Sequence, residues 1–138
     1  MTPDEVRDYL GAAFPQVFGG TTLRLVSAEA GRATLRLTPD ESHLRPGGVI
    51  SGPTLMMLAD ASAYAALLSL STNAKMAVTS NLNVTFLRGA MLGEDIIQTA
   101  EVIRSGRRLS VIVCEAFGGD GTRLLAHATM TYAMPAAG

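Results

Sequence analysis

The sequence predicts an α+β fold in which an antiparallel sheet of five to six strands wraps around one long central helix. Segments with alternating apolar and polar residues lie on both sides of the chain's middle, as in strands with one buried face. Short glycine-containing turns join several of these segments, which favours antiparallel pairing. The longest apolar run, residues 53–70, lies between the two groups and has the length of a helix.

The composition indicates a single domain, residues 1–138, that associates with itself. Apolar residues make up 48% of the 138 residues and charged residues 17%, and this length is sufficient for one hydrophobic core. The low share of charge indicates apolar surface that other copies cover, so we expect a homo-oligomer. The net charge of −1 contains no block of one sign, which argues against a nucleic-acid partner.

The first twenty residues predict a helix and a linker. Thr2, Pro3 and Glu5 form the pattern of a helix start, in which Thr2 is the cap and Glu5 closes a capping box. We find no export signal in this segment. The single cysteine, Cys114, falls in a strand-like segment and suits a reducing compartment, so we expect a cytoplasmic protein.

Residues 21–134 form the core of the domain in this interpretation. Two strands, residues 22–25 and 33–38, follow from period-two alternation on either side of a turn at residues 29–31. Residues 38–48 hold two prolines and two glycines and predict a loop. Four further strands are expected after the long helix, at residues 75–87, 95–104, 108–117 and 123–134.

The long helix, residues 53–71, contains Asp60, which is the only charged residue between Arg45 and Lys75. Burying an ionised carboxylate without partners costs several kcal/mol, so this position predicts a functional acid. The helix is long enough to raise the question of a membrane span. Asp60 near its centre, and the absence of flanking basic clusters, instead predict a buried helix and no membrane partner.

The order of these segments resembles the hotdog fold, and more narrowly the phenylacetate-pathway (PaaI-like) acyl-CoA thioesterases of the 4-hydroxybenzoyl-CoA thioesterase superfamily. The residues that carry the resemblance are 43–60, 78–88, 93–95, 105–108 and 121–127. This family typically has His-Gly-Gly ahead of the helix and an acid eight residues after the first of those glycines. Here Ser51-Gly52-Pro53 takes that place, and Asp60 follows Gly52 by eight residues. Ser51 and Pro53 therefore depart from the family pattern.

The resemblance implies hydrolysis of aryl or medium-chain acyl-CoA thioesters, with coenzyme A as part of the substrate and no cofactor. The backbone amide of Gly52, at the helix N-terminus, is the candidate oxyanion donor. Asp60 is the candidate general base or nucleophile, and the sequence leaves these two roles open. The resemblance also implies a homodimer or a homotetramer with sites between paired subunits. Thr79 matches a position where relatives carry a hydroxyl that orients the nucleophile, and we expect it to act across a subunit boundary.

Further residues are candidates for contact with the substrate. Tyr64 follows Asp60 by one turn on the same helix face, and Ser51 replaces the family's histidine. Arg45 precedes Asp60 by fifteen residues and either pairs with Asp60, holds an acyl substituent or is a solvated loop charge. The resemblance implies that basic residues at strand ends meet the phosphates of coenzyme A, which suits the forked donors of arginine. These residues are Arg88, Arg107 and Arg108.

Several alternatives stay open at this point. Asp60 is either functional or a structural acid bonded to a hydroxyl of Ser62, Thr79 or Ser80. The missing histidine keeps a non-catalytic acyl-CoA sensor under consideration. An enoyl-thioester hydratase is disfavoured, because such enzymes pair the aspartate with a histidine five residues later, where this chain has Ala65. No metal site is expected, because His43 and His127 form no metal or triad pattern with Cys114 and no other residues cluster with ligand spacing.

Overall fold

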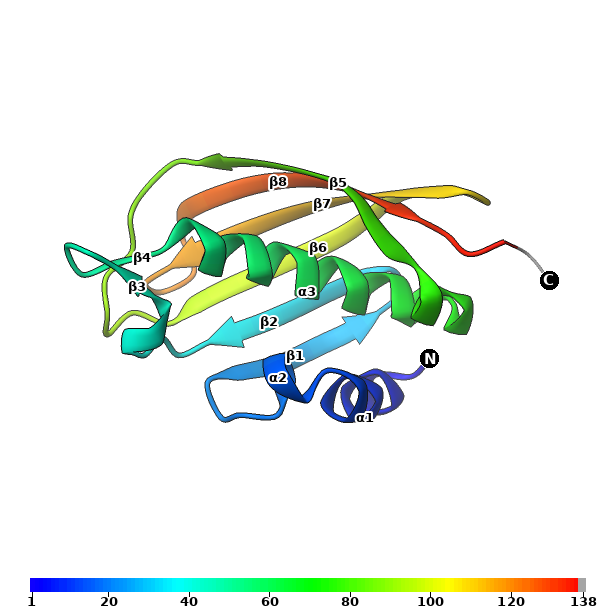
Figure 1. The fold of residues 1–138 in the computed structure, drawn as a ribbon, viewed down its shortest axis with the longest axis horizontal. Coiled ribbons are helices and arrows are strands. Elements are labelled where there is room, and N and C mark those ends of the chain that lie inside the picture. Colours follow the sequence, from blue (N-terminus) through cyan, green and yellow to red (C-terminus); the bar gives the residue numbers. More distant parts are fainter. Residues whose placement is uncertain (137–138) are drawn as a thin grey trace.

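A six-stranded antiparallel sheet curves around one long helix, α3 (Gly52–Leu70), in the computed structural model, which describes residues 1–136 (Figure 1). The strand order across the sheet is β1-β2-β6-β7-β8-β5, so β1 and β5 are its edges. The predicted class and the predicted sheet around a central helix are therefore confirmed. The strands are β1 (Leu23–Glu29), β2 (Arg32–Leu37), β5 (Val78–Phe86), β6 (Ile96–Ser105), β7 (Leu109–Gly118) and β8 (Arg123–Ala133).

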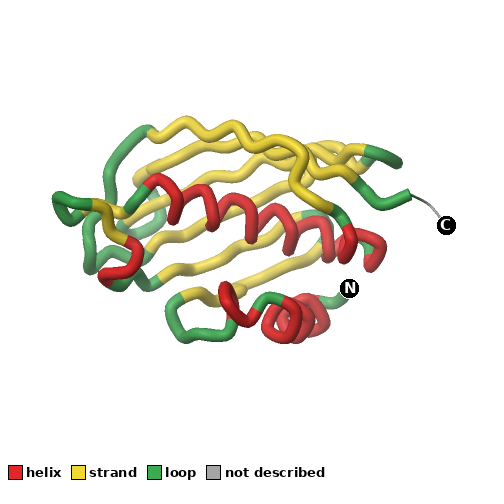
Figure 2. Tube along the Cα trace, viewed as in Figure 1, coloured by secondary structure: helices red, strands yellow, loops and turns green. Residues whose placement is uncertain are grey.

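The N-terminal helix α1 (Pro3–Ala13) begins with the predicted capping box. Thr2 Oγ1 accepts the amide hydrogen of Glu5 at 3.2 Å, and Glu5 Oε1 accepts that of Thr2 at 3.1 Å. A second short helix, α2 (Pro15–Phe18), follows directly and was not predicted. Pro15 starts it, because proline's fixed φ suits a first helical position. Both helices lie beside β1, below α3 in Figure 2.

Helix α3 is the core of the domain and begins one residue earlier than predicted. Its start is capped by Ser51, whose Oγ accepts the amide hydrogen of Thr54 at 3.2 Å. By length and composition alone α3 could cross a membrane, but 61% of its most apolar window is buried inside the domain. Leu58, Ala63 and Leu68 have no exposed surface, as expected for a helix enclosed by a sheet.

Two segments differ from the prediction. The stretch expected to be loop contains a small hairpin, in which β3 (Leu44–Arg45) pairs with β4 (Val49–Ile50). Gly47 and Gly48 have positive φ angles of 101° and 78°, and glycine takes such angles without strain, so the chain can reverse there. After α3, residues 72–76 form a 3₁₀ helix capped by Ser71, so that β5 starts at Val78 and not at Lys75.

Candidate active site

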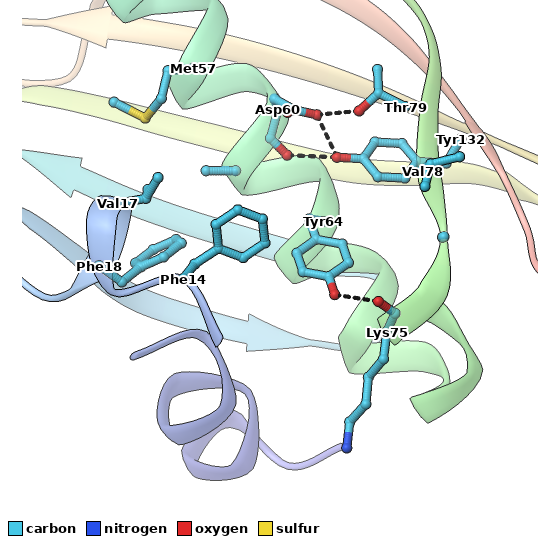
Figure 3. Close-up of a pocket in the computed structure, with 12 residues that line it drawn as sticks. Phe14, Val17, Phe18, Met57, Asp60, Tyr64, Lys75, Val78, Thr79 and Tyr132 are labelled. Atoms are coloured by element: carbon cyan, nitrogen blue, oxygen red, sulfur yellow. Dashed lines mark hydrogen bonds between the residues drawn. The ribbon is translucent and has the colours of Figure 1, made fainter. Parts of the chain in front are cut away.

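Asp60 lies in the third turn of α3, and two hydroxyl groups hold its carboxylate (Figure 3). Oδ1 accepts hydrogen bonds from Thr79 Oγ1 at 2.7 Å and from the Tyr132 hydroxyl at 2.5 Å. Both donors belong to the same chain as Asp60. The expectation that Thr79 acts across a subunit boundary is therefore wrong, because β5 folds back along α3 and carries Thr79 to Asp60. The acid is partly buried and bonded, not simply solvated.

Tyr132 is a partner of Asp60 that the sequence reasoning missed. Its side chain lies on β8 and is buried, with 3% of the residue exposed. Burial, together with the nearby Asp60 carboxylate, raises the pKa of Tyr132 above its usual range, so the phenol stays protonated and donates. Tyr132 is in phase with Ala128 and Met130, which are buried on the same face of β8. This period-two pattern was the available signal.

A pocket of about 320 Å³ opens beside Asp60, and most of its lining is apolar. Figure 3 shows that one wall comes from the end of α1 and from α2, and the opposite wall from α3 and the start of β5. A cavity of about 150 Å³ accommodates benzene, so this pocket has room for an aryl or a medium-chain group. The large apolar side chains of these walls are Phe14, Val17, Phe18, Met57 and Val78.

Tyr64 lines the same pocket one turn after Asp60, as the helical spacing predicts. Its hydroxyl donates to the Lys75 carbonyl at 2.7 Å and lies 3.3 Å from the Tyr9 hydroxyl. The Tyr64 ring stacks on Tyr132 at 6.3 Å between centroids and meets the Phe14 ring edge to face at 5.9 Å. Burial raises the pKa of Tyr64. Tyr64 is thus a buried part of the pocket wall, and its hydroxyl hydrogen is already donated to the Lys75 carbonyl.

Gly52 is the first residue of α3, and its amide has no hydrogen-bond partner within residues 1–136. Ser51 holds the helix start: its Oγ lies 2.8 Å from Thr54 Oγ1 and also accepts the Thr54 amide. A Cβ on Gly52 would lie 3.4 Å from the ring of Phe86, at the far end of β5. The amide, with the positive end of the helix dipole behind it, is available to a developing negative charge.

Gly52 and Asp60 are eight residues apart on one helix, which corresponds to about 12 Å along the axis. A reacting carbonyl has to lie about 3 Å from both the oxyanion donor and the attacking group. One chain therefore cannot present Gly52 and Asp60 to the same carbonyl. Strand β5 connects the two positions, because Thr79 near its start bonds Asp60 and Phe86 at its end lies against Gly52.

The four candidate arginines lie away from the pocket. Arg45 is exposed on the β3–β4 hairpin, Arg88 is exposed just after β5, and Arg107 and Arg108 are exposed in the β6–β7 turn. Within the described part of the chain, none of them forms an ion pair, and none lines the pocket beside Asp60. In a single chain Arg45 is thus a solvated hairpin charge and does not pair with Asp60.

Neither histidine lines the pocket beside Asp60, whereas Cys114 lies close to it, with its Sγ donating to the Ala59 carbonyl at 3.6 Å. His43 Nδ1 accepts the amide hydrogen of Asp40 at 2.9 Å, and His127 Nδ1 lies 3.4 Å from Glu115 on the sheet. Cys114 is buried, and burial raises the pKa of its thiol to about 12, so it stays a thiol. Among residues 1–136, no three histidine, cysteine, aspartate or glutamate residues are arranged to hold a metal ion.

Comparison with known proteins shows the family of the chain. The sequence model of the thioesterase superfamily matches residues 47–132, a range that includes Gly52, Asp60, Thr79 and Tyr132. The chain is 34% identical to human acyl-coenzyme A thioesterase 13 over 97 residues, which are 70% of this chain and 67% of that protein. The chain therefore belongs to the thioesterase superfamily. It is a thioester hydrolase.

Solved structures show the same fold. Zebra fish thioesterase superfamily member 2 superimposes with a TM-score of 0.87 over 98% of this chain and 99% of its own, at 24% identity. A hypothetical thioesterase protein from Streptococcus pneumoniae, solved with coenzyme A, gives a TM-score of 0.77 over 83% of this chain and 86% of its own, at 20% identity. The predicted hotdog fold is confirmed.

Proposed function

We propose that this thioester hydrolase acts on acyl-CoA thioesters with aryl or medium-chain acyl groups. The observation that carries the proposal is the Asp60 carboxylate at the apolar pocket: Oδ1 is held by two hydroxyls, and Oδ2 has no hydrogen-bond partner among residues 1–136. The name of the human relative, an acyl-coenzyme A thioesterase, supports coenzyme A as the thiol part of the substrate.

In the proposed reaction the Gly52 amide donates a hydrogen bond to the thioester oxygen as negative charge develops there. Asp60 either takes a proton from a water that attacks the carbonyl carbon, or attacks that carbon itself to form an anhydride that water then cleaves. The C–S bond breaks in both routes. The products are the carboxylic acid and the free thiol of coenzyme A, and no cofactor is required.

The distance between Gly52 and Asp60 supports a site formed by two copies of the chain. Strand β5 is an edge of the sheet, and a two-fold axis that pairs an edge strand with its own copy makes the two strands antiparallel. The start of one β5, beside Asp60, then lies next to the end of the other, beside Gly52. Large apolar side chains exposed on and next to β5 support burial there: Met76, Val78, Phe86 and Leu87.

Arg88, Arg107 and Arg108 are the proposed contacts for the phosphates of coenzyme A. All three are exposed and lie next to strand ends, where a charged, flexible part of the substrate can reach them. A cytoplasmic location suits this substrate and the free thiol of Cys114.

The test is an assay of free thiol released from a panel of aryl and linear acyl-CoA substrates. We expect turnover by the native protein and a loss of kcat of at least about a hundredfold in Asp60→Asn, because an amide cannot act as the base or the nucleophile. Asp8→Asn, an exposed position on α1, is the matched control and keeps its activity.

Other outcomes of the panel separate the alternative functions. Acyl-CoA binding without thiol release would favour a sensor, and addition of water to an enoyl-CoA without thiol release would favour a hydratase. Near-normal kcat in Asp60→Asn contradicts the mechanism.

A further inference from the structure

The Tyr132 hydroxyl meets Asp60 at two points, the carboxylate Oδ1 at 2.5 Å and the main-chain oxygen at 3.0 Å. A donor that lies against both the side chain and the backbone of one residue restricts rotation about that residue's Cα–Cβ bond. We propose that Tyr132 is a positioning residue of the hydrolase, which fixes the Asp60 carboxylate so that Oδ2 faces the substrate. This inference rests on the proposed function of Asp60.

The sheet brings Tyr132 and Thr79 to the same oxygen. They are directly opposite each other in the β5–β8 ladder, and one residue of β5, Ser80, is then bulged out before the pairing resumes at Asn81. The bulge changes the phase of β5. Leu82 and Val84 are the partly buried residues of this strand, and without the extra residue Ser80 would share their face and Thr79 would point the other way. The bulge therefore aims Thr79 at the carboxylate beside Tyr132.

Of the two donors, Tyr132 is the more firmly held. It is 3% exposed, stacks on Tyr64 at an angle of 11° and sits between strands β5 and β7 in the sheet. Within one chain, Thr79 lies on an edge strand of the sheet, next to the bulge at Ser80. Hydrogen bonds to an ionised acceptor are stronger than those between neutral groups. We therefore assign the fixed geometry of Asp60 mainly to Tyr132.

Replacing Tyr132 with phenylalanine separates this role from packing, because the ring remains and only the hydroxyl is lost. Hydrogen bonds to a charged group are stronger than those between neutral groups, so we expect kcat of Tyr132→Phe to fall about tenfold or more. The KM for the best substrate of the panel should stay within about twofold, since the apolar contacts of the pocket are kept. Tyr9→Phe is the matched control: it removes a tyrosine hydroxyl that lies against Tyr64 and does not touch Asp60.

Two further measurements exclude a merely structural role. Thermal unfolding of both variants shows whether the fold is retained. In the Asp60→Asn background, Tyr132→Phe should cause no further loss of the residual turnover, whereas a general packing defect would lower turnover in either background.

The inference is overturned by unchanged kcat in Tyr132→Phe, by a rise in KM at constant kcat, or by an equal loss in the Asp60→Asn background. These outcomes leave the proposed function standing as long as Asp60→Asn itself is inactive. Absence of thiol release by the native protein, or retained turnover in Asp60→Asn, would instead contradict the proposed function.

Discussion

The two proposed functional positions on α3, Gly52 and Asp60, differ in how much of their surroundings one chain supplies. Around Asp60 the chain provides two hydroxyl donors, from β5 and β8, and an apolar pocket closed on one side by α2. Around Gly52 it provides only a helix cap from Ser51 and the half-exposed ring of Phe86. The carboxylate half of the site is complete within one chain, and the oxyanion half is open.

This difference follows from the physics of a helix. Unpaired amides and the positive end of the dipole occur only at the N-terminus, so an oxyanion donor has to be an end residue that solvent or substrate can reach. A carboxylate that needs fixed partners is best placed further along, where neighbouring strands surround it. A single helix therefore separates the two groups by about 12 Å, and a second copy is the direct way to bring them together.

The largest effect on kcat is expected from blocking access to the Gly52 amide. In Gly52→Val the added side chain blocks the approach of the substrate to the amide, and loss of an oxyanion donor typically lowers kcat by about a hundredfold or more. A Cβ on Gly52 meets the Phe86 ring at 3.4 Å, an ordinary van der Waals distance, so we expect the fold to remain, as measured by thermal unfolding. Gly20→Val, at a position where a Cβ meets nothing within 4 Å, is the control. Native-like kcat in Gly52→Val would contradict the role of the Gly52 amide as oxyanion donor.

A smaller effect, on the choice between acyl groups, is expected from enlarging the pocket beside Asp60. Phe14→Ala removes a ring that lies edge to face on Tyr64 and forms part of the pocket wall. The space gained should raise kcat/KM for larger acyl groups relative to smaller ones by about tenfold, the low end of the discrimination that one methylene gives in an apolar pocket. The ratio between two substrates in the same variant is its own control. An equal change for all acyl-CoA substrates would mean that Phe14 does not border the acyl group.

The sequence was sufficient where the signal is local. The isolated acid in an apolar run made Asp60 a candidate, the eight-residue spacing made Gly52 a candidate, and period-two alternation predicted the strands. The α1 capping box was also predictable, because its partners are three residues apart. Each of these features depends on residues close together in the chain.

The features that were missed depend on strand pairing. Tyr132 is 72 residues from Asp60, and only the sheet order places it there. Thr79 was a candidate that the family resemblance placed across a subunit boundary. The bulge at Ser80, which aims Thr79 at Asp60 of the same chain, cannot be read from the alternation of β5. Helix α2, which forms part of the pocket wall, is a single turn and too short for a periodic pattern.

The most direct test of a site shared between two copies is a hybrid of two inactive variants. Asp60→Asn and Gly52→Val chains carrying different affinity tags are coexpressed, and the mixed oligomer is purified through both tags. In a mixed dimer, one site combines Gly52 of the first chain with Asp60 of the second, and the other site lacks both groups. We predict that thiol release returns to about half of the native kcat per dimer, because one of two sites is complete. A hybrid as inactive as its two parent variants would contradict a site shared between two copies of the chain.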